Sequence, residues 1–305
     1  MHMTNPFEIP GTWYKANLHV HTTTSDGGLS PRQTVEEYRR AGYAVLALTD
    51  HLATNDVRGL SDEGFLVIGG VEYHPHLLTR PVQLHLVGLN VPHGLAFDDG
   101  EDANRCLAQV RQAGGETVLA HPFWSGLEYA DFCHLEGLAA VEVYNFASDE
   151  NGRGDSENEW AYVLDRGIRI PAVAVDDAHF HCRMPGHGGE PDAFGGWTWL
   201  KLPSLTVENV LEAVRTGAFY ASGGPMIEDF RIERDEIVVH CSPARRIYVK
   251  TNAPGGGQRR IAEPGEALRT FCVPLSETWE YVRAVVVDAA GKHAWTNPIF
   301  MGGAK

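Results

Sequence analysis

The sequence has few cysteines, and they do not form a recognisable pattern. The five cysteines are odd in number, widely spaced and never arranged as CxxC. Disulfide scaffolds use dense, even sets of cysteines, and zinc–thiolate sites use closely spaced pairs, so both are disfavoured. Only Cys182 lies near other candidate ligands, and a free or buried thiol is the better interpretation for it. The positions are Cys106, Cys133, Cys182, Cys241 and Cys272.

Long apolar runs are also missing. No run approaches the roughly 20 residues that a membrane-spanning helix needs. The segment from Met1 to Pro10 lacks the basic and then apolar pattern of a secretion signal. We therefore expect a cytoplasmic location and no membrane partner.

Positive charge is scarce. The chain has 25 Lys and Arg residues against 40 Asp and Glu residues, which gives a formal net charge of −15. Such a balance repels the phosphate backbone of nucleic acids, so a nuclease that grips long DNA or RNA is disfavoured. A small anionic substrate drawn to bound metal is compatible with it. The sequence does not indicate an oligomeric state.

Histidine, by contrast, is abundant, with 15 residues in a chain of 305. His19 and His21 stand two apart within a strand predicted from Trp13 to Thr22. Alternate residues of a strand face the same side, so both imidazoles would point one way while Leu18 and Val20 enter the core. Two such imidazoles can form half of a metal site, or a hydrogen-bonded pair that lines a cleft.

Short apolar strands alternate with helices through the first two-thirds of the chain. This alternation predicts an α/β domain with a parallel sheet or a β/α barrel. A Ser30 cap with Pro31 and Gln33 begins the first helix, and Thr206 begins the last. After Trp13 to Thr22, strands are predicted at 44–48, 65–71, 82–89, 117–120, 141–144, 170–175 and 197–202, and helices at 31–41, 103–113, 159–166 and 207–216.

Residues that carry chemistry follow these strands at one end. In α/β folds, ligands gather at the C-terminal edge of the strands. Purely structural histidines would have no reason to choose that edge repeatedly, so the pattern favours one shared site. The residues at or just beyond strand ends are His21, Asp50 with His51, Glu72, His121, and Asp177 with His179.

The pattern changes after residue 222. Short alternating strands at 229–234, 236–241, 246–251, 271–274 and 281–288 are separated by turns. This spacing predicts a small antiparallel β-sandwich. We place the boundary near Gly223-Gly224-Pro225, which divides the chain into domains of residues 1–222 and 223–305.

The chain resembles the PHP (polymerase and histidinol phosphatase) metallohydrolases in six motifs over about residues 13 to 222. The resemblance implies a distorted seven-stranded β/α barrel followed by a β domain. The segments from Phe219 to Pro225 and from Ala294 to Pro298 resemble the branch that includes carbaryl hydrolase. The six motifs are His19-Val20-His21-Thr22, Ser25-Asp26-Gly27, Thr49-Asp50-His51, Glu72, His121-Pro122 and Asp177-Ala178-His179.

The resemblance implies two or three divalent metal ions and assigns ligands to them. A carboxylate that bridges two cations about 3.5–4 Å apart suits this chemistry, and Zn, Mn or Fe would fit such ligands. His85 is an open choice between a ligand and a core histidine. The implied sets are His19, His21, Glu72 and Asp177 for the first metal, Glu72, His121 and His85 for the second, and Asp26, His51 and His179 for the third.

Other polar residues near these motifs receive separate interpretations. Asp50 and Asp176 are expected to orient imidazole N–H groups, or to be turn residues. Three further histidines, His74, His76 and His93, match no motif and are interpreted as structural.

Four residues are the candidates for the catalytic step. Glu72 and His179 would act from within the metal cluster. His181 and Arg183 follow in the next loop, where they can contact substrate, protonate the leaving group or grip a phosphate. The alternative for the two loop residues is ordinary exposure to solvent.

Metal-dependent hydrolysis is the function that these features predict. Three ligand carboxylates against two or three dications leave a positive surplus, which favours an anionic substrate. We expect a phosphoesterase that acts on a small phosphate ester through a hydroxide bridging the metals. The alternative is a carbamate, ester or amide hydrolase of the carbaryl-hydrolase type. A non-catalytic, metal-holding binding module is the third hypothesis.

Overall fold

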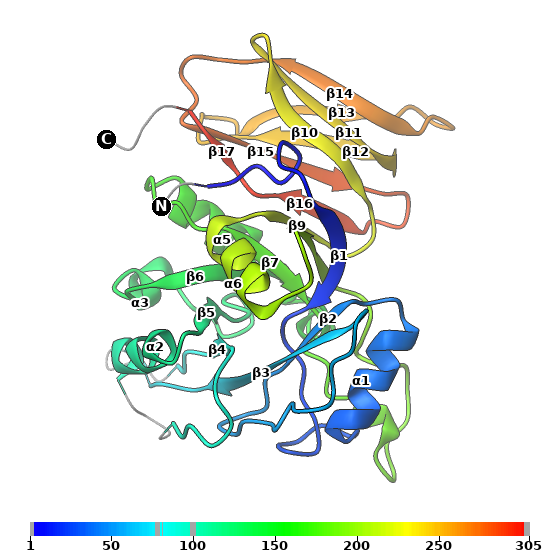
Figure 1. Cartoon of the computed structure of the whole chain (residues 1–305). Coiled ribbons are helices and arrows are strands. Elements are labelled where there is room, and N and C mark those ends of the chain that lie inside the picture. Colours follow the sequence, from blue (N-terminus) through cyan, green and yellow to red (C-terminus); the bar gives the residue numbers. More distant parts are fainter. Residues whose placement is uncertain (1–2, 77–79, 81, 98–101, 302–305) are drawn as a thin grey trace.

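The computed structural model describes residues 3–76, 80, 82–97 and 102–301. Its described strands form a 14-stranded mixed sheet and a separate three-stranded antiparallel sheet. Figure 1 shows the C-terminal strands stacked on the part of the chain that carries the predicted motifs, with β1 (Thr12–Asn17) and β9 (Phe219–Ser222) at the junction. The protein is therefore a mixed α/β structure.

The strands that carry the motifs lie side by side in the order β8-β1-β2-β3-β4-β5-β6-β7. Strands β1, β2 and β3 are parallel, as are β5, β6 and β7, while β4 runs antiparallel to both of its neighbours. The start of β4 therefore lies at the edge where the other strands end. The bounds are β2 Val45–Leu48, β3 Leu66–Tyr73, β4 Leu86–Leu89, β5 Glu116–Leu119, β6 Leu138–Asn145, β7 Ala172–Val175 and β8 Trp197–Leu202.

The reversal of β4 corrects the prediction of a uniformly parallel sheet. The predicted strand at 82–89 begins only at Leu86, and His85 precedes it. An antiparallel bridge between His76 and Gln83 shows why: the chain returns from β3 as a hairpin. A parallel neighbour would instead need a long crossover connection, which is usually helical.

The main helices lie where the sequence predicts them. Helix α1 begins with the expected capping box, in which Ser30 and Gln33 bond to each other's backbone. Thr206 caps α6, and Gly217 ends it with φ +77°. The helices are α1 Pro31–Arg40, α2 Ala103–Gln112, α3 Tyr129–Phe132, α4 Phe146–Asp149, α5 Glu157–Leu164 and α6 Val207–Thr216, with a 3₁₀ turn at His181–Arg183.

The chain leaves β1 before it reaches the two histidines, so the predicted strand from Trp13 to Thr22 is too long. Beyond Asn17 the backbone bonds instead to the segment that follows β7. Asp177 N donates to His19 O (3.0 Å), and His21 N donates to Ala178 O (2.9 Å). The two ends of the row β1 to β7 therefore meet, and they meet at the candidate site.

The C-terminal strands extend the large sheet. Strand β9 pairs with β8 on one side and with β16 (His293–Thr296) on the other. β12 (Arg246–Lys250) and β15 (Tyr281–Val287) continue it, and their apolar side chains share a cluster with the three-stranded sheet. That sheet consists of β10 Ile227–Glu233, β11 Glu236–Ala244 and β14 Leu268–Pro274.

The sequence did not predict every strand of this region. Four observed strands were not predicted: β9, β13 (Gly257–Ile261), β16 and β17 (Ile299–Phe300). The domain boundary near residue 223 stays a prediction, and the ends of the two ranges, residues 1–2 and 302–305, lie outside the described residues. Within the described chain, no helix has the length and apolar character needed to cross a membrane.

Candidate metal centre

Four buried side chains converge where β1 and β7 meet. His19 and His21 point their Nε2 atoms at each other, 3.1 Å apart, so the two imidazoles converge although neither lies in β1. Glu72 Oε2 lies 3.3 and 3.2 Å from these two nitrogens. Asp177 Oδ1 lies 3.1 and 3.0 Å from them. The residues predicted for the first metal therefore lie together in space.

The spacing of these four atoms fits a shared cation. Ligand atoms about 2.1 Å from one metal lie about 2.9 to 3.4 Å apart at octahedral to tetrahedral angles. Glu72 Oε2 and Asp177 Oδ1 are buried and accept no hydrogen bond from any described residue. Buried polar atoms without partners are costly, so a cation explains both features at once.

A second group shares Glu72 through its other oxygen. His85 Nδ1 lies 2.7 Å from Glu72 Oε1, and His121 Nε2 lies 3.4 Å from it. His85 reaches this position because β4 starts at the edge where β3 and β5 end. The geometry therefore favours the ligand interpretation of His85 over the core histidine. Its metal-binding role stays a prediction.

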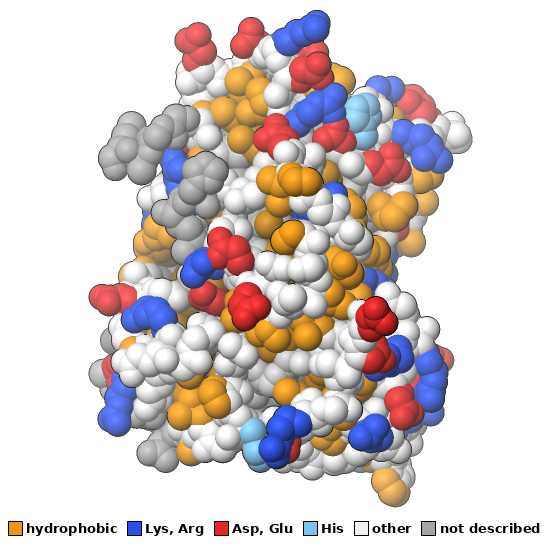
Figure 2. Space-filling view, viewed as in Figure 1, with side chains coloured by type: hydrophobic (Ala, Val, Ile, Leu, Met, Phe, Trp, Pro, Cys, Tyr) orange, Lys and Arg blue, Asp and Glu red, His pale blue; other side chains and the backbone are white. Residues whose placement is uncertain are grey.

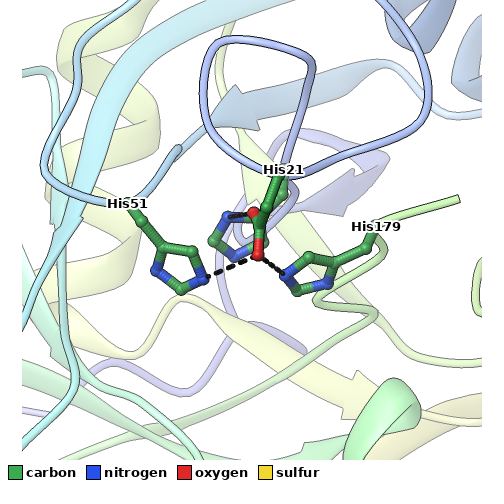
Figure 3. A group of neighbouring side chains, drawn as sticks. His21, His51 and His179 are labelled. Atoms are coloured by element: carbon green, nitrogen blue, oxygen red, sulfur yellow. Dashed lines mark ion pairs between the residues drawn. The ribbon is translucent and has the colours of Figure 1, made fainter. Parts of the chain in front are cut away.

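A third group shares His21 with the first. Asp26 Oδ2 lies 3.6 Å from His51 Nε2 and 3.5 Å from His179 Nε2. His21 Nδ1 lies 3.8 Å from Asp26 Oδ1. Figure 3 shows the three labelled imidazoles gathered around this carboxylate. This group is more exposed than the other two, since half of the Asp26 side chain is accessible.

Two glycines place Asp26 over the cluster. A Cβ on Gly27 would stand 2.7 Å from the backbone of His21, and one on Gly28 would stand 2.3 Å from Phe180 O. Gly28 N donates to His179 O (2.6 Å). The loop can therefore pack directly on the backbone of two candidate ligands only because these residues lack side chains.

Asp50 and Asp176 do not orient imidazoles, which was the first of their two predicted roles, but hold loops and turns in place. Asp50 accepts hydrogen bonds from Thr22 N (2.8 Å) and Ser25 N (3.0 Å), so it orders the loop that carries Asp26. Asp176 accepts from Tyr38 OH (2.8 Å) and from the backbone of the 195–196 turn. Neither carboxylate bonds to an imidazole among the described residues. Each carboxylate directly precedes a candidate ligand in the sequence, and its side chain bonds to a loop instead of facing the cluster.

The carboxylate that does orient an imidazole is Glu142, which the sequence analysis missed. Its Oε1 lies 2.7 Å from His19 Nδ1, and its Oε2 accepts from His121 N (2.8 Å). Asn145 Nδ2 donates to Glu142 Oε2 (2.9 Å) and to Asp177 Oδ2 (3.2 Å). One signal was available: Glu142 is a lone acid in the apolar run of β6.

His74 also lies closer to the cluster than predicted. The sequence analysis interpreted His74 as structural. In the structure, its Nε2 atom lies 2.9 Å from His51 Nδ1 and 3.9 Å from Glu72 Oε2. It forms a further possible ligand group with those two residues. No family motif contains it, which is why the sequence gave no reason to include it.

The two predicted loop residues lie at the rim. His181 is exposed, and its ring lies 5.1 Å from that of His179, with Nε2 3.2 Å from Asp26 O. Arg183 is exposed and makes no ion pair with a described carboxylate. The structure therefore brings His181 beside the third group but leaves Arg183 without a contact to the cluster.

The cluster is strongly coupled electrostatically. Burial opposes a charge on His19, but Asp177, Glu142 and Glu72 outweigh it and raise its pKa well above the ordinary value. The same balance, with Asp177 and Glu72 as partners, raises the pKa of His21 to about 9. Burial would raise the pKa of Glu72, yet His19 and His85 hold it well below its usual range. The carboxylates are therefore ionised and demand positive charge.

Two candidate ligands have a strained backbone. His121 has φ +23° and Asp177 has φ +57°, a region that residues with side chains rarely adopt. Such a conformation costs of order 1–3 kcal/mol and persists where the surroundings impose it. In both residues it turns the chain at a strand end. It aims the side chain of His121 at Glu72 and that of Asp177 at His19 and His21.

Comparison with known proteins found relatives in sequence but no matching family model. No family model matches the chain. A phosphoribosyl 1,2-cyclic phosphate 1,2-diphosphodiesterase of Eggerthella lenta is 35% identical over 82 residues, which is 26% of this chain and 31% of that protein. A 5'-3' exoribonuclease of Haemophilus influenzae is 27% identical over 259 residues, 83% of this chain and 80% of that protein.

A solved structure shares the fold along the whole chain. It is a two-domain protein from Bacteroides vulgatus that contains a predicted PHP-like metal-dependent phosphoesterase. The match has a TM-score of 0.50 at 14% identity and covers 100% of this chain and 92% of that one. The fold of the chain is thus similar to that of this protein.

Proposed function

We propose that this protein is a divalent-metal-dependent phosphoesterase that acts on a small phosphate ester. The observation that carries the proposal is the sharing of Glu72 and His21 among three adjacent groups of possible ligands. Groups linked by a common ligand hold cations close together, which is the arrangement of two-metal hydrolytic sites. When bound, such cations polarise a phosphoryl oxygen and lower the pKa of a water.

The residues around the cluster prepare it for this role. Glu142 Oε1 beside His19 Nδ1 (2.7 Å) and Ser125 Oγ beside His121 Nδ1 (3.2 Å) hold the two imidazoles in one orientation, so their Nε2 atoms face the carboxylates. Glu142 also adds a fourth carboxylate to the three of the ligand groups, of which Asp26 is half exposed. With four carboxylates, two dications would be balanced and three would leave a surplus of two positive charges. We therefore favour three cations for binding an anionic substrate.

The two curated relatives support a phosphoester rather than a carbonyl substrate, because both are named for cleavage of phosphodiester bonds. One of them is named as an exoribonuclease, yet we propose a small substrate here. The net charge of −15 disfavours a long polyanion. On the face seen in Figure 2, acidic and basic side chains are interspersed rather than gathered into a basic track.

We extend the proposal to the architecture. Residues 1–222 would form the distorted seven-stranded barrel that holds the metals, and residues 223–305 an antiparallel sandwich packed on it. The meeting of β1 and β7 at the site supports the first part. The shared apolar cluster of the two C-terminal sheets supports the second.

A substrate panel tests the proposed activity. The protein loaded with Mn²⁺ or Zn²⁺ would be assayed on p-nitrophenyl phosphate, bis(p-nitrophenyl) phosphate, 1-naphthyl acetate and 1-naphthyl N-methylcarbamate. We expect turnover of a phosphate ester, abolished by EDTA and restored by metal. Turnover of the carbonyl substrates alone would replace the phosphoesterase with the carbaryl-hydrolase alternative. No turnover of any substrate would favour the binding module.

A further inference from the structure

One large aromatic side chain stands exposed beside the cluster. Trp124 is 40% exposed, whereas most large apolar side chains of the described chain are buried. Exposed aromatic surface of this kind costs hydration free energy and often marks a binding site. The other exposed large apolar residues include Tyr162 on α5, which has no contact with the cluster among the ring contacts of the structure.

Trp124 forms a wall of the second ligand group. Its ring lies 5.0 Å from the ring of His121 and 5.7 Å from that of His85, at 78° and 72° to them. The indole is thus nearly perpendicular to both imidazoles. An ester bound over Glu72, His85 and His121 would have its organic part next to this ring.

The backbone of the loop that carries Trp124 is held in place. Ser125 N donates to His121 O (3.1 Å), and Leu127 N donates to Pro122 O (2.9 Å), so the loop is a closed turn. Arg153 reaches across from another segment, donates to Trp124 O (3.5 Å) and stacks on the Phe123 ring. A rigid aromatic surface loses little entropy when it binds a flat partner.

We propose that Trp124 is a specificity-determining residue that stacks on a planar aromatic group of the substrate. This inference rests on the proposed function and narrows it: the preferred phosphate ester carries an aryl or heteroaromatic group on the side of the second ligand group. Stacking tolerates any flat π system, so it selects planarity rather than a pattern of hydrogen bonds. The contrasting role would be a lid that only shields His85 and His121 from water.

Paired phosphonates separate the two roles without depending on turnover. Phenylphosphonate and methylphosphonate carry the same anionic head and differ only in the aromatic group. Calorimetric titration of the Mn²⁺-loaded protein would give both dissociation constants. We expect wild type to bind phenylphosphonate about 10-fold more tightly, Trp124→Ala to lose that preference, and Trp124→Phe to keep most of it. Tyr162→Ala, the exposed-aromatic control, should match wild type.

The outcomes are distinguishable. Equal affinity of wild type for the two phosphonates, or a preference that survives Trp124→Ala, would overturn the inference while leaving hydrolysis of phosphate esters intact. Loss of metal from Trp124→Ala, measured by elemental analysis, would also overturn it, because the indole would then serve the metal site. The protein could instead prefer phenylphosphonate through Trp124 and yet hydrolyse no ester. That result would support the stacking surface and contradict the proposed function.

Discussion

At the scale of single residues, Glu72 connects the candidate site. Its two oxygens face different ligand groups, Oε2 toward His19 and His21 and Oε1 toward His85 and His121. A carboxylate with this arrangement can bridge two cations. Glu72 is buried, and its Oε2 atom accepts no hydrogen bond from a described residue. The negative charge of Glu72 therefore needs positive charge nearby.

The titration of His21 predicts opposite pH effects with and without metal. After metal removal, the raised pKa of about 9 means that protonated His21 stabilises the fold through Glu72 and Asp177. That contribution is complete below pH 6.5, the ordinary pKa, and is lost as the pH rises through about 9. Metal binding requires the neutral imidazole, so metal affinity should rise over the same range.

Thermal unfolding from pH 6 to pH 10 checks this. We expect the Tm of the EDTA-treated protein to fall across the range, while the Tm of the Mn²⁺-loaded protein rises relative to it. Parallel curves for the two forms would show that protons and metal do not compete at His21.

Residue-level prediction from the sequence identified only the candidate ligands that belong to motifs. His19, His21 and Asp177 lie where a strand-end pattern puts them. Glu142 and His74 come together with the cluster only through the pairing of distant strands, and no local pattern reports such pairing. Their contacts therefore had to come from the structure.

At the scale of elements, the loop from Thr22 to Ser30 decides whether the third ligand group exists. Asp50 orders it from one side, and the contacts of Gly27 and Gly28 with the backbone fix it from the other. The loop carries Asp26, the carboxylate of that group. The first two groups do not depend on this loop for a carboxylate.

Gly27→Ala should therefore disturb the third group selectively. The added Cβ meets the His21 backbone at 2.7 Å, so the loop must shift and carry Asp26 away. We expect loss of about one metal ion per chain and lower stability, by about 1–3 kcal/mol for such overpacking. Elemental analysis and urea unfolding give the two values.

Gly188→Ala is the matched control, since its Cβ would meet open space without a positive φ. It should keep the wild-type metal content and stability. Full metal content in Gly27→Ala would show that the loop does not hold a metal.

The strands illustrate the limit of prediction at this scale. Apolar runs located β2, β3 and β7 well, because burial on both faces leaves a strong signal. The direction of β4 was wrong, because a strand and its reverse have the same pattern of burial. The hairpin that includes the His76–Gln83 bridge and the antiparallel pairing with β3 and β5 set the direction of β4, and this reversal brings His85 to the site.

At the scale of the whole molecule, the two parts of the chain are bound together by a continuous sheet. β16 pairs with β9, which in turn pairs with β8 beside β1. Buried Arg283 of β15 donates to Glu157 at the start of α5 (2.8 Å), and Tyr281 OH donates to Asp165 (2.8 Å). Shared hydrogen bonds and a buried ion pair make independent unfolding of either part unfavourable.

We therefore expect a single unfolding transition. Urea denaturation followed by far-UV circular dichroism and by tryptophan fluorescence should give coincident curves, since tryptophans lie in both parts of the chain. Two separated transitions would show that residues up to 222 and those beyond fold as independent units.

The sequence located the change of pattern near residue 223, but it could not show this continuity. The partner of β9 lies more than 70 residues along the chain from it, in the strand β16 that no pattern predicted. Pairings of this kind depend on tertiary packing, not on local propensity.

Metal content per chain tests the central claim most directly: the buried cluster around Glu72 holds catalytic cations. Wild type and Glu72→Gln would be saturated with Mn²⁺, freed of excess metal and measured by elemental analysis, with circular dichroism to confirm folding. We predict two or three ions per wild-type chain and at most one, held by the third group, in the folded variant. A wild-type protein that retains no metal, or a variant that retains the full complement, would contradict the account.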